Sequence, residues 1–249
     1  MLDSRSLSII DDCNIHSNEN LFDTWDSEIS DSCDKLCFLT SEQSQLYNSI
    51  GDTSQSDARD ESLFQIISSS LRIQNSTCIY NQGKIMNMFV SDVEVVDSII
   101  ENINVSESMI IVTSSTFDLI NTTLINIYEH SDAQLMFMNL ESKLKIFSCN
   151  FIQINSQLIT SRNSDISIND LLLSDIVSNS TLVQISRSNQ VVIGGLNTHN
   201  ITLTSGSIFE MSNLNNVELS EFNFLNIKER ILTIQSSNID LIHNFRIIN

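Results

Sequence analysis

The sequence predicts an all-β parallel β-solenoid, in which the chain coils and each strand pairs with its equivalent one turn later. Short apolar clusters recur about every 24 residues from residue 63 onward, and such a period is typical of repeat architectures. Within each cluster, apolar and polar residues alternate with a period of two, which indicates strands. The polar segments between clusters are too short for crossover helices, so consecutive strands turn corners of one coil.

The second cluster of each repeat is the clearest marker, because it is an apolar-x-apolar triplet that occurs eight times. Successive triplets are 22 to 27 residues apart and average 24. We therefore expect about 8–9 rungs of about 24 residues once a first rung near the N-terminus is included. The triplets are Leu71–Ile73, Val93–Val95, Phe117–Leu119, Leu144–Ile146, Ile166–Ile168, Val191–Ile193, Val217–Leu219 and Ile239–Leu241.

Two further clusters keep the same register, which predicts three strands per rung. The first cluster begins at Leu63, Ile85, Met109, Leu135, Leu158, Leu182, Ile208 and Ile231. The third ends in an isoleucine usually preceded by Asn, Asp or Gln, at Ile103, Ile127, Ile154, Ile176, Ile201 and Ile227.

A mostly small or polar residue follows each triplet by two positions and predicts a corner. With no proline and only five glycines, the chain must build its corners from other residues. Asn and Asp tolerate left-handed backbone and can hydrogen-bond to the corner of the next rung. The row is Asn75, Asp97, Asn121, Ser148, Asp170, Gly195, Glu221 and His243.

The middle residues of the triplets support this register. It places Arg72 beside Glu94, and Asp118 beside Lys145, so opposite charges meet on adjacent strands.

These repeats resemble the right-handed parallel β-helix of pectin-lyase-like proteins, particularly the low-proline, Asn/Ser/Ile-rich repeat proteins of protist cell surfaces. The resemblance covers residues 63–249 and concerns architecture rather than activity. It implies a cell-surface or extracellular location if the chain is a fragment, whereas the chain taken as complete is expected to be cytoplasmic. A leucine-rich repeat has a compatible period, but its Asn follows the last strand leucine by three residues rather than two.

Residues 1–62 are expected to form a first rung followed by an acidic loop or cap. Leu7-Ser-Ile9 and Cys13-Asn-Ile15 predict the rung. Residues 1–61 contain 14 acidic and 3 basic residues, so they carry −11 of the net charge of −19. The segment from His16 to Glu61 lacks the repeat, and we expect an inserted loop with a short helix over residues 41–50.

Charge and hydropathy exclude several functions. The chain has no cluster of Lys and Arg of the kind that binds nucleic acid or anionic membranes. Its N-terminus lacks the apolar region of a signal peptide, and no apolar stretch is long enough to span a bilayer. At the other end, residues 247–249 lie in a strand without a polar cap, so we expect a partner or further chain to cover that end.

Enzymes with the resembled fold act on acidic polysaccharides through carboxylates on neighbouring rungs. The register places Glu94 beside Asp118, and Glu218 beside Asp240, as candidate ligand-binding pairs; we interpret them as surface charges rather than catalytic dyads. The outward row of the first strands contains only one acidic residue: Gln65, Asn87, Ile111, Phe137, Thr160, Gln184, Glu210 and Thr233. His199 follows Gly194-Gly195, which predicts a bulged corner or, alternatively, a ligand-contacting loop.

The cysteines offer one metal hypothesis. Cys13, His16, Cys33 and Cys37 are ligand types with the pair spacing of a zinc site, although their overall spacing is loose. Unrelated thiols in a loop are the alternative, and no cofactor is indicated. Cys78 and Cys149 lie three repeats apart, too far for a disulfide, and are expected to be small buried residues.

Ile111 and Phe137 should point outward from strands that are also apolar inside. We expect the acidic segment to cover this surface through Leu36, Phe38, Leu39 or Leu46, with an oligomer contact as the alternative. Burial of Ile111 and Phe137 in the interior would contradict the register.

These observations favour a non-catalytic structural, binding or adhesion segment that contacts carbohydrate or protein through its walls. The competing function is a polysaccharide lyase or glycoside hydrolase. Three or more charged groups converging in one groove would favour the enzyme, and flat walls of Ser, Thr and Asn would favour the scaffold.

Overall fold

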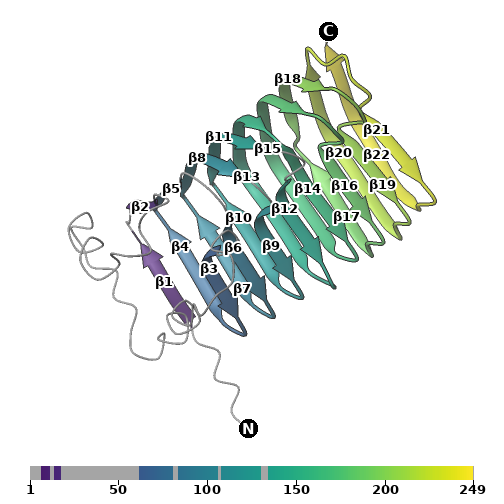
Figure 1. The fold of residues 1–249 in the computed structure, drawn as a ribbon. Coiled ribbons are helices and arrows are strands. Elements are labelled where there is room, and N and C mark those ends of the chain that lie inside the picture. The colour runs from purple at the N-terminus through teal and green to yellow at the C-terminus, as the bar shows by residue number, and fades with distance from the viewer. Residues whose placement is uncertain are drawn as a thin grey trace.

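The computed structural model describes residues 7–11, 14–17, 62–80, 84–105, 108–129 and 134–248. These residues form a parallel β-solenoid of about seven turns of about 24 residues, which confirms the predicted fold class (Figure 1). The described residues contain no helix, in contrast to a leucine-rich repeat of strands and helices. The acidic segment 18–61 lies outside the described residues, and so do its expected helix and wall contacts.

The first wall is an eight-stranded sheet in which every strand pairs with its equivalent one turn later. The residues of the predicted row from Gln65 to Thr233 lie opposite one another on successive strands. The strands of wall 1 are β3 (Ser62–Ile67), β6 (Lys84–Phe89), β9 (Ser108–Thr113), β12 (Gln134–Asn139), β14 (Gln157–Arg162), β16 (Val183–Ser186), β19 (Phe209–Ser212) and β21 (Leu232–Gln235).

The second and third walls belong to one 14-stranded sheet, because four long strands cross from wall 2 to wall 3 without interruption. These crossing strands are β13 (Lys143–Asn155), β15 (Asp165–Ser178), β20 (Asn216–Leu225) and β22 (Ile239–Ile248). Wall 2 also contains β1 (Leu7–Asp11), β4 (Ser70–Gln74), β7 (Asp92–Val96), β10 (Thr116–Ile120) and β17 (Gln190–Gly194). Wall 3 also contains β2 (Asn14–Ser17), β5 (Thr77–Tyr80), β8 (Ile99–Val105), β11 (Thr123–Glu129) and β18 (Asn197–Leu203).

Left-handed backbone forms the corner after wall 2, as predicted. The φ angles of Asn75, Asp97, Asn121, Ser148, Asp170, Gly195 and Glu221 lie between 47° and 62°. The eighth predicted corner, His243, is wrong, because the left-handed residue is Asn244. A β-bulge between Val217 and Glu218 in the pairing of β20 with β22 shifts the last strand by one residue.

The N-terminal strands extend the coil, since β1 pairs with β4 and β2 with β5. Their alignment differs from the predicted one by one residue. Ser8 lies opposite Leu71 and Ile10 opposite Ile73, so Leu7 and Ile9 are not the equivalents of the triplet residues.

The interior is a continuous apolar column of stacked Ile, Leu, Val, Met and Phe side chains. Cys78 and Cys149 are buried free thiols in this column, as expected. Buried serines line the corner between walls 1 and 2: the backbone N–H of Ser91 donates to Ser115 Oγ at 3.0 Å, and that of Ser69 to Ser91 Oγ at 3.3 Å. Hydroxyls inside the corner thus satisfy peptide groups that the ladder between strands leaves unpaired.

Ile111 and Phe137 pair on the outer face of wall 1 and are partly exposed, which confirms the register. Ile67 and Phe89, which also pair, are about half exposed at the edge of this wall. Wall 1 therefore presents an apolar surface over its first turns.

Candidate functional site

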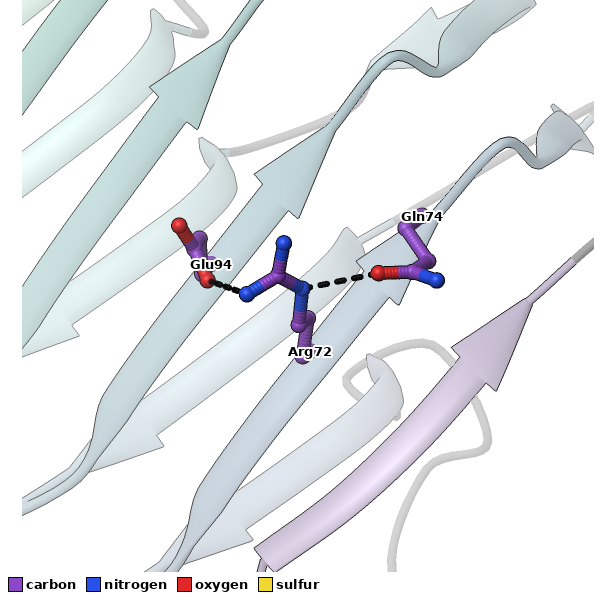
Figure 2. A network of polar contacts seen from close by, with 3 residues as sticks. All are labelled: Arg72, Gln74 and Glu94. Atoms are coloured by element: carbon purple, nitrogen blue, oxygen red, sulfur yellow. Dashed lines mark hydrogen bonds and ion pairs between the residues drawn. The ribbon is translucent and has the colours of Figure 1, made fainter.

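The main charged cluster lies on wall 2, where four strands place Arg72, Glu94, Asp118 and Lys145 in one row. Arg72 Nη1 lies 2.9 Å from Glu94 Oε2, and Arg72 Nε donates to Gln74 Oε1 at 2.9 Å (Figure 2). Both members of the ion pair are partly exposed, so water screens their attraction. The contact fixes the position of Glu94 more than it stabilises the fold.

Asp118 lies beside Glu94, as the sequence predicts, but its own charge is disfavoured. Partial burial raises the pKa of the Asp118 carboxyl, and attraction to Lys145 lowers it. Repulsion from Glu94 and Asp92 raises the pKa further. Two acidic and two basic side chains thus form a row with almost no net charge, so the row does not create a strong electrostatic potential of one sign.

A shallow polar groove of about 120 Å³ lies next to this row, at the corner between walls 1 and 2. Its charged lining residues are Asp92, Glu141 and Lys143, and its remaining lining is mostly Ser and Thr. Asp92 and Lys143 each precede a triplet by one residue. The repeat pattern did not identify them as site residues, because it considers only the residues within the triplets. Glu141 occupies an additional corner position, where Leu140 and Glu141 both have left-handed backbone. The long 27-residue repeat step signals this insertion in the sequence.

The second predicted acidic pair does not form a matched pair. Glu218 lies opposite Leu241, because the β-bulge displaces Asp240 from the register. The prediction that Glu218 and Asp240 are register neighbours is therefore wrong. The sequence does not reveal the displacement, because residues 239–241 have the same apolar-x-apolar pattern as a regular triplet.

His199 lies on wall 3, opposite Ser174 and Leu225, and is partly exposed. The neighbouring corner residue Asn200 donates its Nδ2 to Asp175 Oδ1 at 2.9 Å and accepts from Asn226 Nδ2 at 3.0 Å. The bonds from Asn200 and Ser174, and the proximity of His199, lower the pKa of Asp175. His199 thus borders a structural ladder of side-chain amides.

Gly195 occupies a left-handed corner where a side chain would be crowded. A Cβ atom at Gly195 would lie 2.4 Å from Asp170 Oδ1, and the φ angle is +62°. The expected bulge is wrong, because Gly194 and Asn197 keep the same register with β15 as the residues of regular turns.

The zinc hypothesis lies largely outside the described residues: Cys13, Cys33 and Cys37 are not described, and only the backbone of His16 is. Within the described ranges, no group of three or more His, Cys, Asp or Glu side chains is arranged to hold a metal ion. The same part of the chain has no helix long and apolar enough to cross a membrane.

Comparison of the chain with protein-family models, with curated proteins and with solved structures finds no match.

Proposed function

We propose that the protein is a non-catalytic structural or binding segment of a cell-surface or secreted assembly. In this proposal the coil is right-handed and pectin-lyase-like, and it acts as a stiff rod whose walls contact carbohydrate or protein. The location rests on the sequence resemblance alone. The role of a rod is supported by the continuous apolar column and by side-chain ladders that connect neighbouring turns.

The proposal rests mainly on one observation: the groove beside the charged row is shallow. Enzymes and small-molecule binders enclose most of their ligand in cavities of roughly 300–1,000 Å³. The groove beside the charged row measures about 120 Å³. A long partner can lie along several turns of a flat wall, whereas this groove is too small to enclose a substrate.

The wall residues suit such a partner. Alternate residues of each strand face outward at a spacing of about 4.8 Å between strands. On wall 1 this places the polar residues Gln184, Glu210 and Thr233 in one row on successive strands. Polar rows bind extended polymers by many weak contacts rather than by one deep pocket. The apolar surface around Ile111 and Phe137 gives a second kind of contact, suited to protein.

The test is to measure turnover and binding with the same purified chain. Acidic and neutral polysaccharides are incubated with the protein, and reducing ends and unsaturated products are assayed alongside retention on the immobilised polymers. We expect retention of the rod without product formation. Product formation that is lost in the Glu141→Gln variant but kept in the Glu218→Gln variant would overturn the proposal.

A polysaccharide lyase or hydrolase is the second candidate, and one observation favours it. Asp92, Glu141 and Lys143 line one groove, which meets the requirement that three charged groups converge. An Asp or Glu could act there as general acid or base, and Lys143 could neutralise a substrate carboxylate. The product assay with Glu141→Gln decides between this activity and the non-catalytic rod.

A further inference from the structure

Sequons for N-linked glycosylation, Asn-x-Ser or Asn-x-Thr, occur five times in the chain and are distributed unevenly over the walls. All five lie on wall 3 or at its two edges. Asn104 lies in β8 and Asn200 in β18, both on wall 3, and Asn179 directly follows the end of β15. Asn75 and Asn121 occupy the corner between walls 2 and 3. One side of the coil thus contains every sequon of the sequence.

The side-chain amides of two sequons belong to corner ladders. Asn121 Nδ2 donates to Asp97 Oδ1 at 3.1 Å, and Asn200 Nδ2 donates to Asp175 Oδ1 at 2.9 Å. A sugar on either nitrogen would compete with a bond that connects neighbouring turns. These two positions are therefore less suited to modification than an amide that lies outside the ladders.

Asn104 and Asn179 are better suited, because both side chains are exposed. Thr204 Oγ1 and Ser205 Oγ donate to the backbone carbonyl oxygen of Asn179 at 3.0 and 2.7 Å. Asn179 is the acceptor in both bonds, so a substituent on its Nδ2 disturbs neither. Asn104 lies near the end of β8, one residue before the strand ends at Val105. A glycan at either position would extend into solvent.

Exposed apolar side chains lie beside both of these asparagines. Tyr128 is 53% exposed and is the register partner of Asn104 on the adjacent strand. Val177 is 44% exposed and precedes Asn179 by two residues. Sugar rings have apolar faces formed by their C–H groups, and these faces pack against aromatic and aliphatic side chains. A glycan at each position would therefore cover apolar surface that otherwise faces water.

We propose that wall 3 carries N-linked glycans on Asn104 and Asn179, and that the glycan on Asn104 covers Tyr128. In this modification, Asn Nδ2 forms a bond to the anomeric carbon of an oligosaccharide supplied on a lipid pyrophosphate. The bond between that carbon and the pyrophosphate oxygen breaks, the lipid pyrophosphate leaves, and Nδ2 loses one proton. A cellular transferase of the secretory pathway catalyses the step, so this inference rests on the proposed cell-surface or secreted location.

The modification gives the sides of the rod different roles. Glycans are bulky and hydrophilic, so they keep other macromolecules away from wall 3. The charged row on wall 2 and the apolar surface around Ile111 and Phe137 on wall 1 stay accessible. Partners of the rod therefore bind through walls 1 and 2.

Glycan mapping on the native protein tests the two sites. The protein is captured with an antibody from the surface and medium of the cells that produce it, and separately from their cytosol. Peptide N-glycosidase in heavy-oxygen water converts each glycosylated Asn into a labelled Asp, which mass spectrometry locates. We expect the label at Asn104 and Asn179. Surface protein that lacks the label at one or both positions would overturn this inference and leave the proposed function intact, whereas protein confined to the cytosol would overturn both.

Nitration of tyrosine by tetranitromethane tests the contact with Tyr128, in the full chain secreted from eukaryotic cells behind a cleavable leader. We expect Tyr128 to be nitrated several-fold faster in the Asn104→Gln variant, which lacks the neighbouring glycan. Asn179→Gln is the matched control, because it removes the other glycan and should leave Tyr128 protected. Rates that are equal in the wild type and Asn104→Gln, or raised equally by both substitutions, would overturn this contact. Circular dichroism shows whether each variant keeps its strands.

Discussion

At the scale of single residues, buried hydroxyl groups separate into satisfied and unsatisfied ones. Thr122 is fully buried, and its Oγ1 donates toward the carbonyl oxygens of Ile120 at 2.9 Å and Val95 at 3.3 Å. Thr198 is also buried, but its Oγ1 has no hydrogen-bond partner. A buried hydroxyl without a partner costs free energy, whereas a bonded one contributes modestly.

We therefore expect Thr198→Val to stabilise the protein by about 1 kcal/mol, because it removes the unsatisfied group and keeps the shape. The matched variant Thr122→Val should destabilise by about 1 kcal/mol, since it breaks bonds to backbone carbonyls. Urea unfolding of both variants measures the difference. Equal effects in the same direction would contradict this account of the two hydroxyls.

The carboxyl of Asp118 gives a pH-dependent prediction at the same scale. Because its pKa is raised in the folded state, the folded chain binds the proton more tightly than the unfolded chain, and ionisation of Asp118 destabilises the fold. We expect Asp118→Asn to raise the melting temperature at pH 7. The gain should shrink as the pH falls and disappear below about pH 3, where the carboxyl is protonated in both states. A gain that persists at low pH would assign the effect to packing instead.

At the scale of elements, the corners explain how a chain with no proline and five glycines turns three times per coil. Their left-handed residues are mostly Asn, Asp and Ser, and side-chain amides connect them from turn to turn. In the corner ladder on wall 3, Asn126 Nδ2 donates to Asn102 Oδ1 at 3.1 Å. Asn200 likewise donates to Asp175, and Asn226 donates to Asn200, so these bonds all run from a later turn to the earlier one.

Substitutions of Asn200 test what the left-handed backbone and the ladder contribute to stability. Asn200 has left-handed backbone and side-chain hydrogen bonds to the turns on both sides. We expect Asn200→Ala to destabilise by about 2 kcal/mol, from strained backbone and lost hydrogen bonds. Asn200→Gly should cost about half as much, because glycine adopts this backbone freely. In both variants, NMR titration should show the pKa of Asp175 rising toward its ordinary value. Equal losses of stability in the two variants would contradict a role for the left-handed backbone.

The sequence predicted these elements well wherever the repeat was regular. The triplets, the first seven corners and the outward position of Ile111 and Phe137 follow from the period and the alternation alone. The bulge at Asp240 was missed because Ile239-Asp-Leu241 has the same pattern as a regular triplet. The groove was missed because Glu141 depends on an inserted corner residue, whose placement is set by packing between turns rather than by local sequence.

At the scale of the whole molecule, the coil is a stack in which each turn contacts its neighbours. Stability then depends on contacts between adjacent turns. The proposed rod requires this regular stacking.

Distances between spin labels on the outward row of wall 1 test the stacking most directly. Labels at Asn87 and Gln184 are four turns apart and should lie roughly 19 Å apart, and labels at Asn87 and Thr233 are six turns apart and should lie roughly 29 Å apart. Dilution with unlabelled protein removes distances between copies. We expect a separation that grows in proportion to the number of turns. A Thr233 label no farther from Asn87 than a Gln184 label would contradict the stacked coil.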